Sequence, residues 1–166
     1  MSIIPVKVLR VYDGDTLLIS VNGLTTVGRL RFIDCPEVKK EWQSSSNNKI
    51  LKHWEWGTKS KKFVESLIPA NKILYAFLFE KDKYDRVLCD LYISQEIAEN
   101  SNLQLILCAA GMASYFLPFQ YYDFSSNREL DLFLEIIRKC AMAKSRGVGF
   151  WKDDIPLPYL VKSQKF

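Results

Sequence analysis

Four charged side chains of the types that act on phosphate esters lie within the nine-residue stretch 29–37. Two arginines, Arg29 and Arg31, are followed by two carboxylates, Asp34 and Glu37. Arginine presents a planar fork of donors that matches two phosphate oxygens, and a carboxylate binds a cation or accepts a proton from water. The stretch therefore predicts phosphoryl chemistry, with Arg29 on phosphate and Glu37 activating a water. An ion pair within the fold is the alternative for each arginine.

A second acidic pair, Asp13 and Asp15, lies one hairpin upstream. Hairpin pairing can bring Asp15 beside Asp34, and two adjacent carboxylates repel each other unless a cation lies between them. Oxygen ligands without a histidine or cysteine cluster favour calcium or magnesium over zinc. We therefore predict a metal site of Asp15, Asp34 and the backbone carbonyl of Cys35. The alternative is that the Asp-Gly pair is simply a turn.

A third group of residues, 83–86, reads Lys83-Tyr84-Asp85-Arg86. Arg86 is a second candidate for stabilising a phosphate, and Lys83 and Tyr84 are candidates for contacting a terminal phosphate. The aromatic stretch 115–124 is a candidate for stacking a nucleic-acid base, with core packing as the alternative. Its candidates are Tyr115, Phe116, Phe119, Tyr121 and Tyr122.

The elements that must position these residues follow from the apolar pattern and the turn signals. Apolar runs and the Asn22-Gly23 hairpin signal predict strands over 4–12, 16–21, 25–33, 72–79 and 86–93. Helical spacing predicts helices over 58–68, 103–110 and 129–145, the last with Leu130, Phe133, Leu134, Ile137 and Ala141 on its buried stripe. The order predicts an α+β fold, a five-stranded OB-type Greek-key β-barrel with three α-helices.

The remaining segments are predicted to be irregular. We expect a single domain over 1–166, with a core over about 4–151 and a surface tail over 152–166. Residues 34–56 are polar and predict a long surface loop, in which His53, the chain's one histidine, is solvated.

Composition narrows the class of protein. The formal net charge of +4 is compatible with a nucleic-acid partner but does not require one. The four cysteines are widely spaced, which predicts reduced core thiols rather than a disulfide framework or a zinc site. No signal peptide or membrane-spanning run is visible, so we expect a cytoplasmic protein that does not contact the membrane. Secretion by means of a signal peptide that has been removed is the alternative. We also expect a monomer.

Together these motifs resemble the staphylococcal nuclease family, also called the thermonuclease family, over about residues 6–151. The most specific matches are Val11-Tyr12-Asp13-Gly14-Asp15-Thr16, the stretch 29–37, and Asp82-Lys83-Tyr84-Asp85-Arg86. The resemblance implies an OB barrel with one calcium ion and hydrolysis of DNA or RNA that leaves 3′-phosphates. It implies Asp15, Asp34 and the Cys35 carbonyl as calcium ligands, Arg29 and Arg86 on phosphate, Glu37 as general base, and Lys83 and Tyr84 on the 5′-phosphate.

Three departures from the family pattern bear on activity. Cys35 stands where threonine is common, which matters little if the backbone carbonyl is the ligand. Asp85 stands where glycine is common, and its carboxylate could hold Arg86 away from substrate. The segment 41–56 is longer than expected. There are two alternatives to a calcium-dependent nuclease. One is a silent nucleic-acid-binding module. The other is an OB domain that binds a protein or small molecule and in which the acidic cluster is structural.

Overall fold

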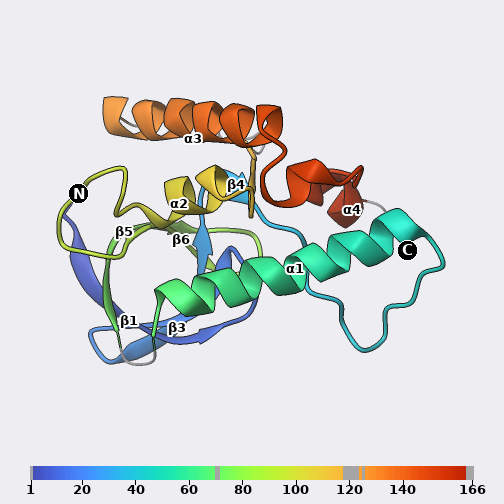
Figure 1. Cartoon of the computed structure of the whole chain (residues 1–166). Helices are drawn as coiled ribbons and strands as arrows, with labels where there is room; N and C mark the ends of the chain where they lie inside the picture. The colour runs from blue at the N-terminus through green and yellow to red at the C-terminus, as the bar shows by residue number, and fades with distance from the viewer. Residues whose placement is uncertain (1, 70–71, 118–123, 125, 164–166) are drawn as a thin grey trace.

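The computed structural model describes residues 2–69, 72–117, 124 and 126–163, and its centre is a closed five-stranded barrel (Figure 1). The strands are β1 (Ile4–Val11), β2 (Thr16–Val21), β3 (Leu24–Leu30), β5 (Ile73–Lys81) and β6 (Val87–Tyr92). Their order is β1-β2-β3-β6-β5, and β5 pairs with β1 to close the barrel. The β3–β6 pair is parallel and the other four pairs are antiparallel. The predicted α+β OB-type barrel is confirmed.

The barrel encloses the main core. Alternate side chains of the strands point inward, as expected of sheets with one solvated face. The most completely buried of these residues are Leu17, Ile19, Leu74, Ala76, Cys89 and Leu91. The β2–β3 hairpin turns at Asn22 and Gly23, with φ of 50° and 84°, which is the geometry that the Asn-Gly signal predicts.

Helices cover one side of the barrel (Figure 1). They are α1 (Asn48–Leu67), α2 (Leu103–Ala109) and α3 (Asn127–Ser145), followed by the short 3-10 helix η1 (Gly149–Lys152) and α4 (Pro158–Ser163). The three predicted helices are present, and α4 was not predicted. Among the described residues, no helix combines the length and apolarity that a membrane crossing requires.

The predicted loop over 34–56 is wrong in its second half, because α1 begins at Asn48. Asn47 caps the helix by accepting a hydrogen bond from the Lys49 N–H at 2.9 Å. Ile50 and Trp54 are buried four residues apart, on the side of α1 that meets the rest of the protein. His53 lies in this half of α1 and is fully buried, so the prediction of a solvated histidine is also wrong.

The predicted buried stripe of α3 is wrong except at Phe133, which is partly buried against the core. The buried side chains are Glu129, Leu132, Ile136, Cys140 and Ala143, whereas Leu130, Leu134 and Ile137 are exposed. Apolar residues line two faces of this helix, so the pattern alone does not select one. In the rotation that the structure adopts, Glu129 forms an ion pair with Arg31, with a 3.1 Å N–O distance.

The predicted third strand ends at Leu30 rather than at residue 33. Phe32 has a φ of 62°, a left-handed conformation that is uncommon for a bulky residue and interrupts the strand. Its ring lies 5.8 Å from that of Phe124 and 5.5 Å from that of Phe133, so aromatic packing holds it there. The chain then forms β4 (Ile33–Asp34), which pairs with β7 (Ser114–Tyr115).

Candidate functional site

The guanidinium of Arg29 joins two buried carboxylates. Its Nη1 lies 2.7 Å from Asp15 Oδ1 and its Nη2 lies 2.8 Å from Asp34 Oδ1. The hairpin register sets the first contact, because Arg29 pairs across the strands with Thr16, the residue after Asp15. The turn at Phe32 sets the second, because it brings Asp34 back onto a residue five positions earlier.

Asp15 is ionised and firmly positioned. Its Oδ2 accepts a hydrogen bond from the Cys35 N–H at 2.6 Å, and its Oδ1 accepts one from the Thr16 hydroxyl at 3.0 Å. Burial by itself would raise the pKa of Asp15, but the charges of Arg29 and Lys162 hold it well below its usual range. The site therefore has a permanent negative charge on Asp15.

Glu37 is held through its backbone by helix α1. Its N–H donates to His53 Nε2 at 3.0 Å, and its carbonyl lies so close to Gly57 that a Cβ there would come within 2.0 Å of the oxygen. Burial lowers the pKa of His53 to about 4, so the ring is neutral near pH 7 and can accept this hydrogen bond. The first half of α1, which the sequence did not predict, therefore positions the Glu37 backbone.

Lys162 of α4 reaches the same carboxylates from the end of the chain. Its Nζ contacts Asp34 Oδ1 directly, lies 2.8 Å from Glu37 Oε1, and lies 3.9 Å from Asp15 Oδ2. Three predicted site carboxylates therefore surround one cationic atom. Among the described residues, no group of three His, Cys, Asp or Glu side chains is arranged as a metal site. Arg29 and Lys162 pair with one oxygen each of Asp34 and Glu37 and with Asp15.

Carboxyl groups outnumber cations in this cluster. Asp13 is the fourth carboxyl, and burial followed by the charge of Asp15 raises its pKa to about 8. Burial also raises the pKa of Asp34, and its Oδ2 is buried without a hydrogen-bond partner. A buried carboxylate oxygen without a partner is a group that a bound cation would satisfy.

The second arginine is engaged elsewhere. Arg86 donates from Nε and Nη2 to Asp82 Oδ2 at 2.8 and 2.6 Å, within its own turn. Asp85, suspected of holding Arg86, instead forms an exposed ion pair with Lys81 at 2.7 Å, so that expectation was wrong. Asp85 has a φ of 63°, a left-handed conformation that explains why glycine suits this position.

The remaining predicted residues that the structure describes lie in the turn between β5 and β6 and on or beside β7. Lys83 and Tyr84 lie in the exposed turn before β6, and the Lys83 Nζ is 5.1 Å from the centre of the Tyr84 ring. Tyr115 is exposed on β7, whose Ser114 pairs with Asp34. The other stacking candidate in the structure, Phe116, packs its ring 6.0 Å from that of Tyr159. Phe119, Tyr121 and Tyr122 lie outside the described residues.

Arg31 serves the fold rather than this cluster. It donates to both carboxylate oxygens of Asp90, at 3.0 and 2.7 Å, and to Glu129 at 3.1 Å. Its guanidinium carbon lies 3.2 Å from the centre of the Phe79 ring. The predicted alternative of a partner carboxylate is therefore correct for Arg31, and Arg29 also has such partners.

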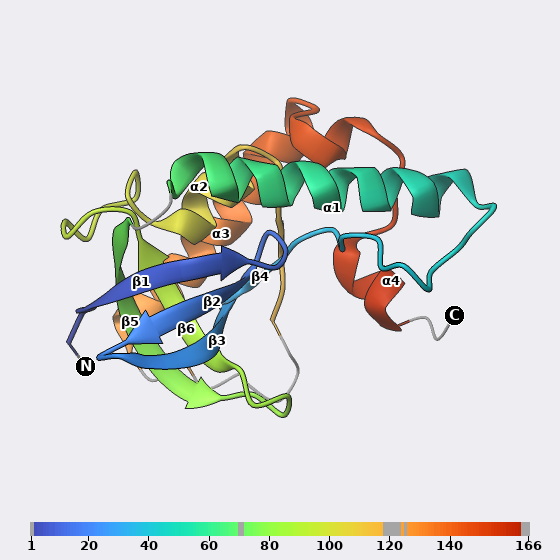
Figure 2. The same ribbon diagram turned by 90° about the horizontal axis from the view of Figure 1, so that it is seen from below.

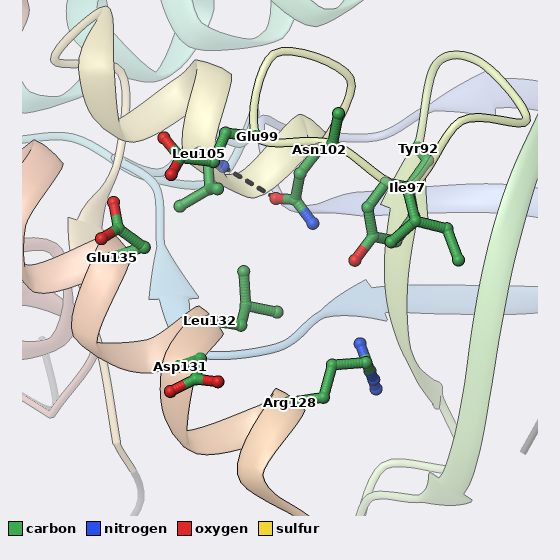
Figure 3. A pocket seen from close by; sticks show the side chains of 10 residues that line it. Tyr92, Ile97, Glu99, Asn102, Leu105, Arg128, Asp131, Leu132 and Glu135 are labelled. Carbon is green, nitrogen blue, oxygen red and sulfur yellow. Dashed lines mark hydrogen bonds between the residues drawn. The ribbon is translucent and has the colours of Figure 1, made fainter.

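A separate pocket lies between β6, α2 and α3 (Figure 3). Asn102 and Arg128 are among the residues that line it, and the side-chain oxygen of Asn102 accepts a hydrogen bond from the Leu105 N–H at 2.9 Å. None of the residues that line this pocket is a predicted site residue. The acidic cluster around Arg29 is therefore the place where the predicted residues meet.

Comparison with known proteins gives a family match and named relatives. The profile of a family described as "Staphylococcal nuclease homologue" matches residues 28–153. A protein of Methanocaldococcus jannaschii named "Uncharacterized protein MJ1439" is 35% identical over 159 residues, which cover 87% of this chain and 70% of that protein. Two proteins named "Uncharacterized endonuclease", from Escherichia coli and Escherichia coli O157:H7, are each 26% identical over 152 residues, 92% of this chain and 80% of theirs.

Proposed function

This chain belongs to the staphylococcal nuclease family, and from that premise we propose that it is a calcium-dependent nuclease that hydrolyses phosphodiester bonds of DNA or RNA. The observation that carries the proposal is the convergence of Asp15, Asp34 and Glu37 on one cationic atom beside Arg29. The endonuclease names of two relatives support the same class of reaction.

The donor atoms of the cluster suit a hard divalent cation. The side chains that converge there offer carboxylate oxygens, which calcium prefers, and the buried Asp34 Oδ2 has no hydrogen-bond partner. Asp15, Asp34 and the carbonyl of Cys35 would hold the ion. When bound, calcium would polarise the phosphate and favour ionisation of water.

Glu37 is the proposed general base. Its side chain is 26% exposed, so water from solvent can reach it, and it shares the Lys162 ammonium with Asp34. The hydrogen bond from its N–H to His53 and the close contact at Gly57 fix the backbone from which the side chain extends. In this role, Glu37 accepts the proton of the water that attacks phosphorus.

Arg29 and Arg86 are proposed to stabilise the charge that develops on the phosphate oxygens. Arg29 is preorganised by its two carboxylate partners in a nearly dry environment, where a fixed cation is most effective. Arg86 is partly exposed, and it must exchange its Asp82 partner for a phosphate oxygen. Lys83, Tyr84 and Tyr115 are proposed to contact the rest of the nucleic-acid strand.

The experiment is a cleavage assay on labelled DNA and RNA oligonucleotides, with calcium, with EDTA, and with calcium restored after EDTA. We expect cleavage with calcium, none in EDTA, and recovery after calcium is restored. The Glu37→Gln variant should bind the oligonucleotide as wild type does and cut at least about a hundredfold more slowly. Undiminished cleavage in EDTA would refute calcium dependence.

A silent nucleic-acid-binding module is the second candidate, and a specific observation favours it. The groups proposed for catalysis are engaged within the protein, because Glu37 pairs with Lys162 and Arg86 pairs with Asp82. If wild type and Glu37→Gln bind oligonucleotides equally and neither cleaves with calcium, the binding module is the correct function.

A further inference from the structure

The chain supplies its own cation to the acidic cluster. The Lys162 ammonium contacts Asp34 Oδ1, lies 2.8 Å from Glu37 Oε1, and lies within 4 Å of Asp15. These are the two proposed calcium ligands with carboxylate side chains and the proposed base. A calcium ion between Asp15 and Asp34 would be repelled by an ammonium that shares an oxygen with it.

A terminal segment, residues 153–162, brings Lys162 to this position, and we call it the strap. Figure 2 shows α4 below the first half of α1, next to the chain that leads away from β4. Asp153 accepts hydrogen bonds from Lys52 Nζ and Trp56 Nε1, both at 2.8 Å, and Asp154 pairs with Lys49. All three donors belong to the part of α1 that the sequence did not predict.

Apart from the contacts of Lys162 itself, the strap is held by weak contacts. Val161 is buried against Ile50 and Trp54, but this small cluster is separate from the main core. The strap's ion pairs with Lys49 and Lys52 involve exposed lysines, and such pairs contribute little stability. Helix α4 has six residues, too few to be stable without its packing contacts.

We propose that the strap is a self-inhibitory element in which Lys162 and calcium compete for the same carboxylates. This inference rests on the proposed function. With the strap docked, Lys162 occupies the cation position and pairs with Glu37, so the base is unavailable. Calcium binding displaces Lys162, releases α4 and frees Glu37. Helix α4 begins beyond residue 153, where the family match ends.

Population arithmetic gives the expected size of the effect. The apparent dissociation constant for calcium is the intrinsic constant divided by the fraction of molecules with the strap released. If about one molecule in ten is released, removing the ammonium tightens calcium binding about tenfold, and a rarer released state gives a larger change. Because calcium and the docked strap exclude each other in this scheme, calcium binding should also release the strap.

The test is a calorimetric titration of the full chain with calcium chloride, for wild type, Lys162→Met and Lys40→Met. Methionine keeps the length and apolar stem of lysine but removes the charge. Lys40 is an exposed lysine of the segment after Glu37, near the Trp42 ring, and controls for the loss of one charge. We expect Lys162→Met to bind calcium at least about tenfold more tightly, and Lys40→Met to resemble wild type.

Hydrogen exchange supplies a readout that does not depend on affinity. In wild type, calcium should speed exchange of the backbone amides of α4, and in Lys162→Met these amides should exchange fast without calcium. Equal calcium affinity for wild type and Lys162→Met, with unchanged exchange of α4, would overturn the proposal and leave calcium dependence intact. If no variant binds calcium, the proposed cofactor is wrong and the competition falls with it. Weaker oligonucleotide binding by Lys162→Met, at unchanged calcium affinity, would overturn the inhibitory role and make Lys162 a substrate contact.

Discussion

Two arginines two residues apart allow a matched test of the proposed site. Arg29 and Arg31 are both largely buried, and each pairs with two carboxylates. Arg29 faces the acidic cluster, whereas Arg31 ties β3 to Asp90 and Glu129. We predict that Arg29→Lys and Arg31→Lys both destabilise the protein, and that only Arg29→Lys abolishes most of the nuclease activity.

The stability loss follows from the geometry of each pair. Arg29 contacts two carboxylates from separate nitrogens, at 2.7 and 2.8 Å, and a lysine ammonium cannot reproduce both contacts. Losing one buried hydrogen bond between charged groups costs about 2 kcal/mol, which lowers Tm by roughly 4–8 °C in a domain of this size. Arg31 makes three such contacts and stacks on Phe79, so Arg31→Lys should cost at least as much.

The two substitutions should differ in catalysis. The guanidinium fork of Arg29 is proposed to stabilise the transition state, and removing one such donor costs about a hundredfold in rate. The assay measures cleavage rates with calcium at a temperature where urea unfolding shows both variants to be fully folded. Arg31→Lys should then cleave at a rate close to that of wild type. If Arg31→Lys loses as much activity as Arg29→Lys, Arg29 has a structural role and its catalytic assignment is wrong.

Two further predictions follow from buried titratable groups. The pKa of His53 is lowered to about 4 from an ordinary 6.5. Between these two values, the histidine of the unfolded chain is protonated while that of the native protein is not, so the native state loses stability as the pH falls. The free energy of unfolding of wild type, measured in urea, should therefore fall by up to about 3 kcal/mol more than that of His53→Gln between pH 7 and pH 4. An equal fall in both proteins would contradict the burial argument. All four cysteines are free and buried, and burial raises the thiol pKa of Cys35 and Cys108. The folded protein should therefore leave Ellman's reagent unreacted while the unfolded chain releases four equivalents, and fast reaction of a native thiol would count against the packing described.

The pairing of Asp15 with Arg29 was predictable because local rules determine it, whereas Asp34 reaches Arg29 through a turn at Phe32 that the sequence did not predict. The Asn22-Gly23 turn fixes the hairpin register, and that register places Arg29 opposite Thr16, next to Asp15. The order of strands and helices predicted the barrel for the same reason, since strand patterns and tight turns are local signals. The roles proposed for these residues in catalysis are hypotheses that the assays above must decide.

Other parts of the site depend on contacts between distant segments, which local sequence patterns do not predict. Lys162 contacts Asp34 across 128 positions and lies in a tail where an isolated lysine carries no signal. Polar residues before Asn48 concealed the start of α1, although Ile50, Trp54 and Gly57 have helical spacing. On α3, apolar residues lie on two faces, and the buried face contains Glu129, which pairs with the distant Arg31.

The two segments whose structure was predicted least well from the sequence, the first half of α1 and the strap, both contact Glu37. The early half of α1 holds the Glu37 backbone through His53 and Gly57, and the strap holds the Glu37 carboxylate through Lys162. These segments also bind each other, through Asp153, Trp56 and Val161. A change that loosens α1 at its start should therefore loosen the strap as well, and the control of Glu37 would then depend on this helix half and the tail as one unit rather than on either alone.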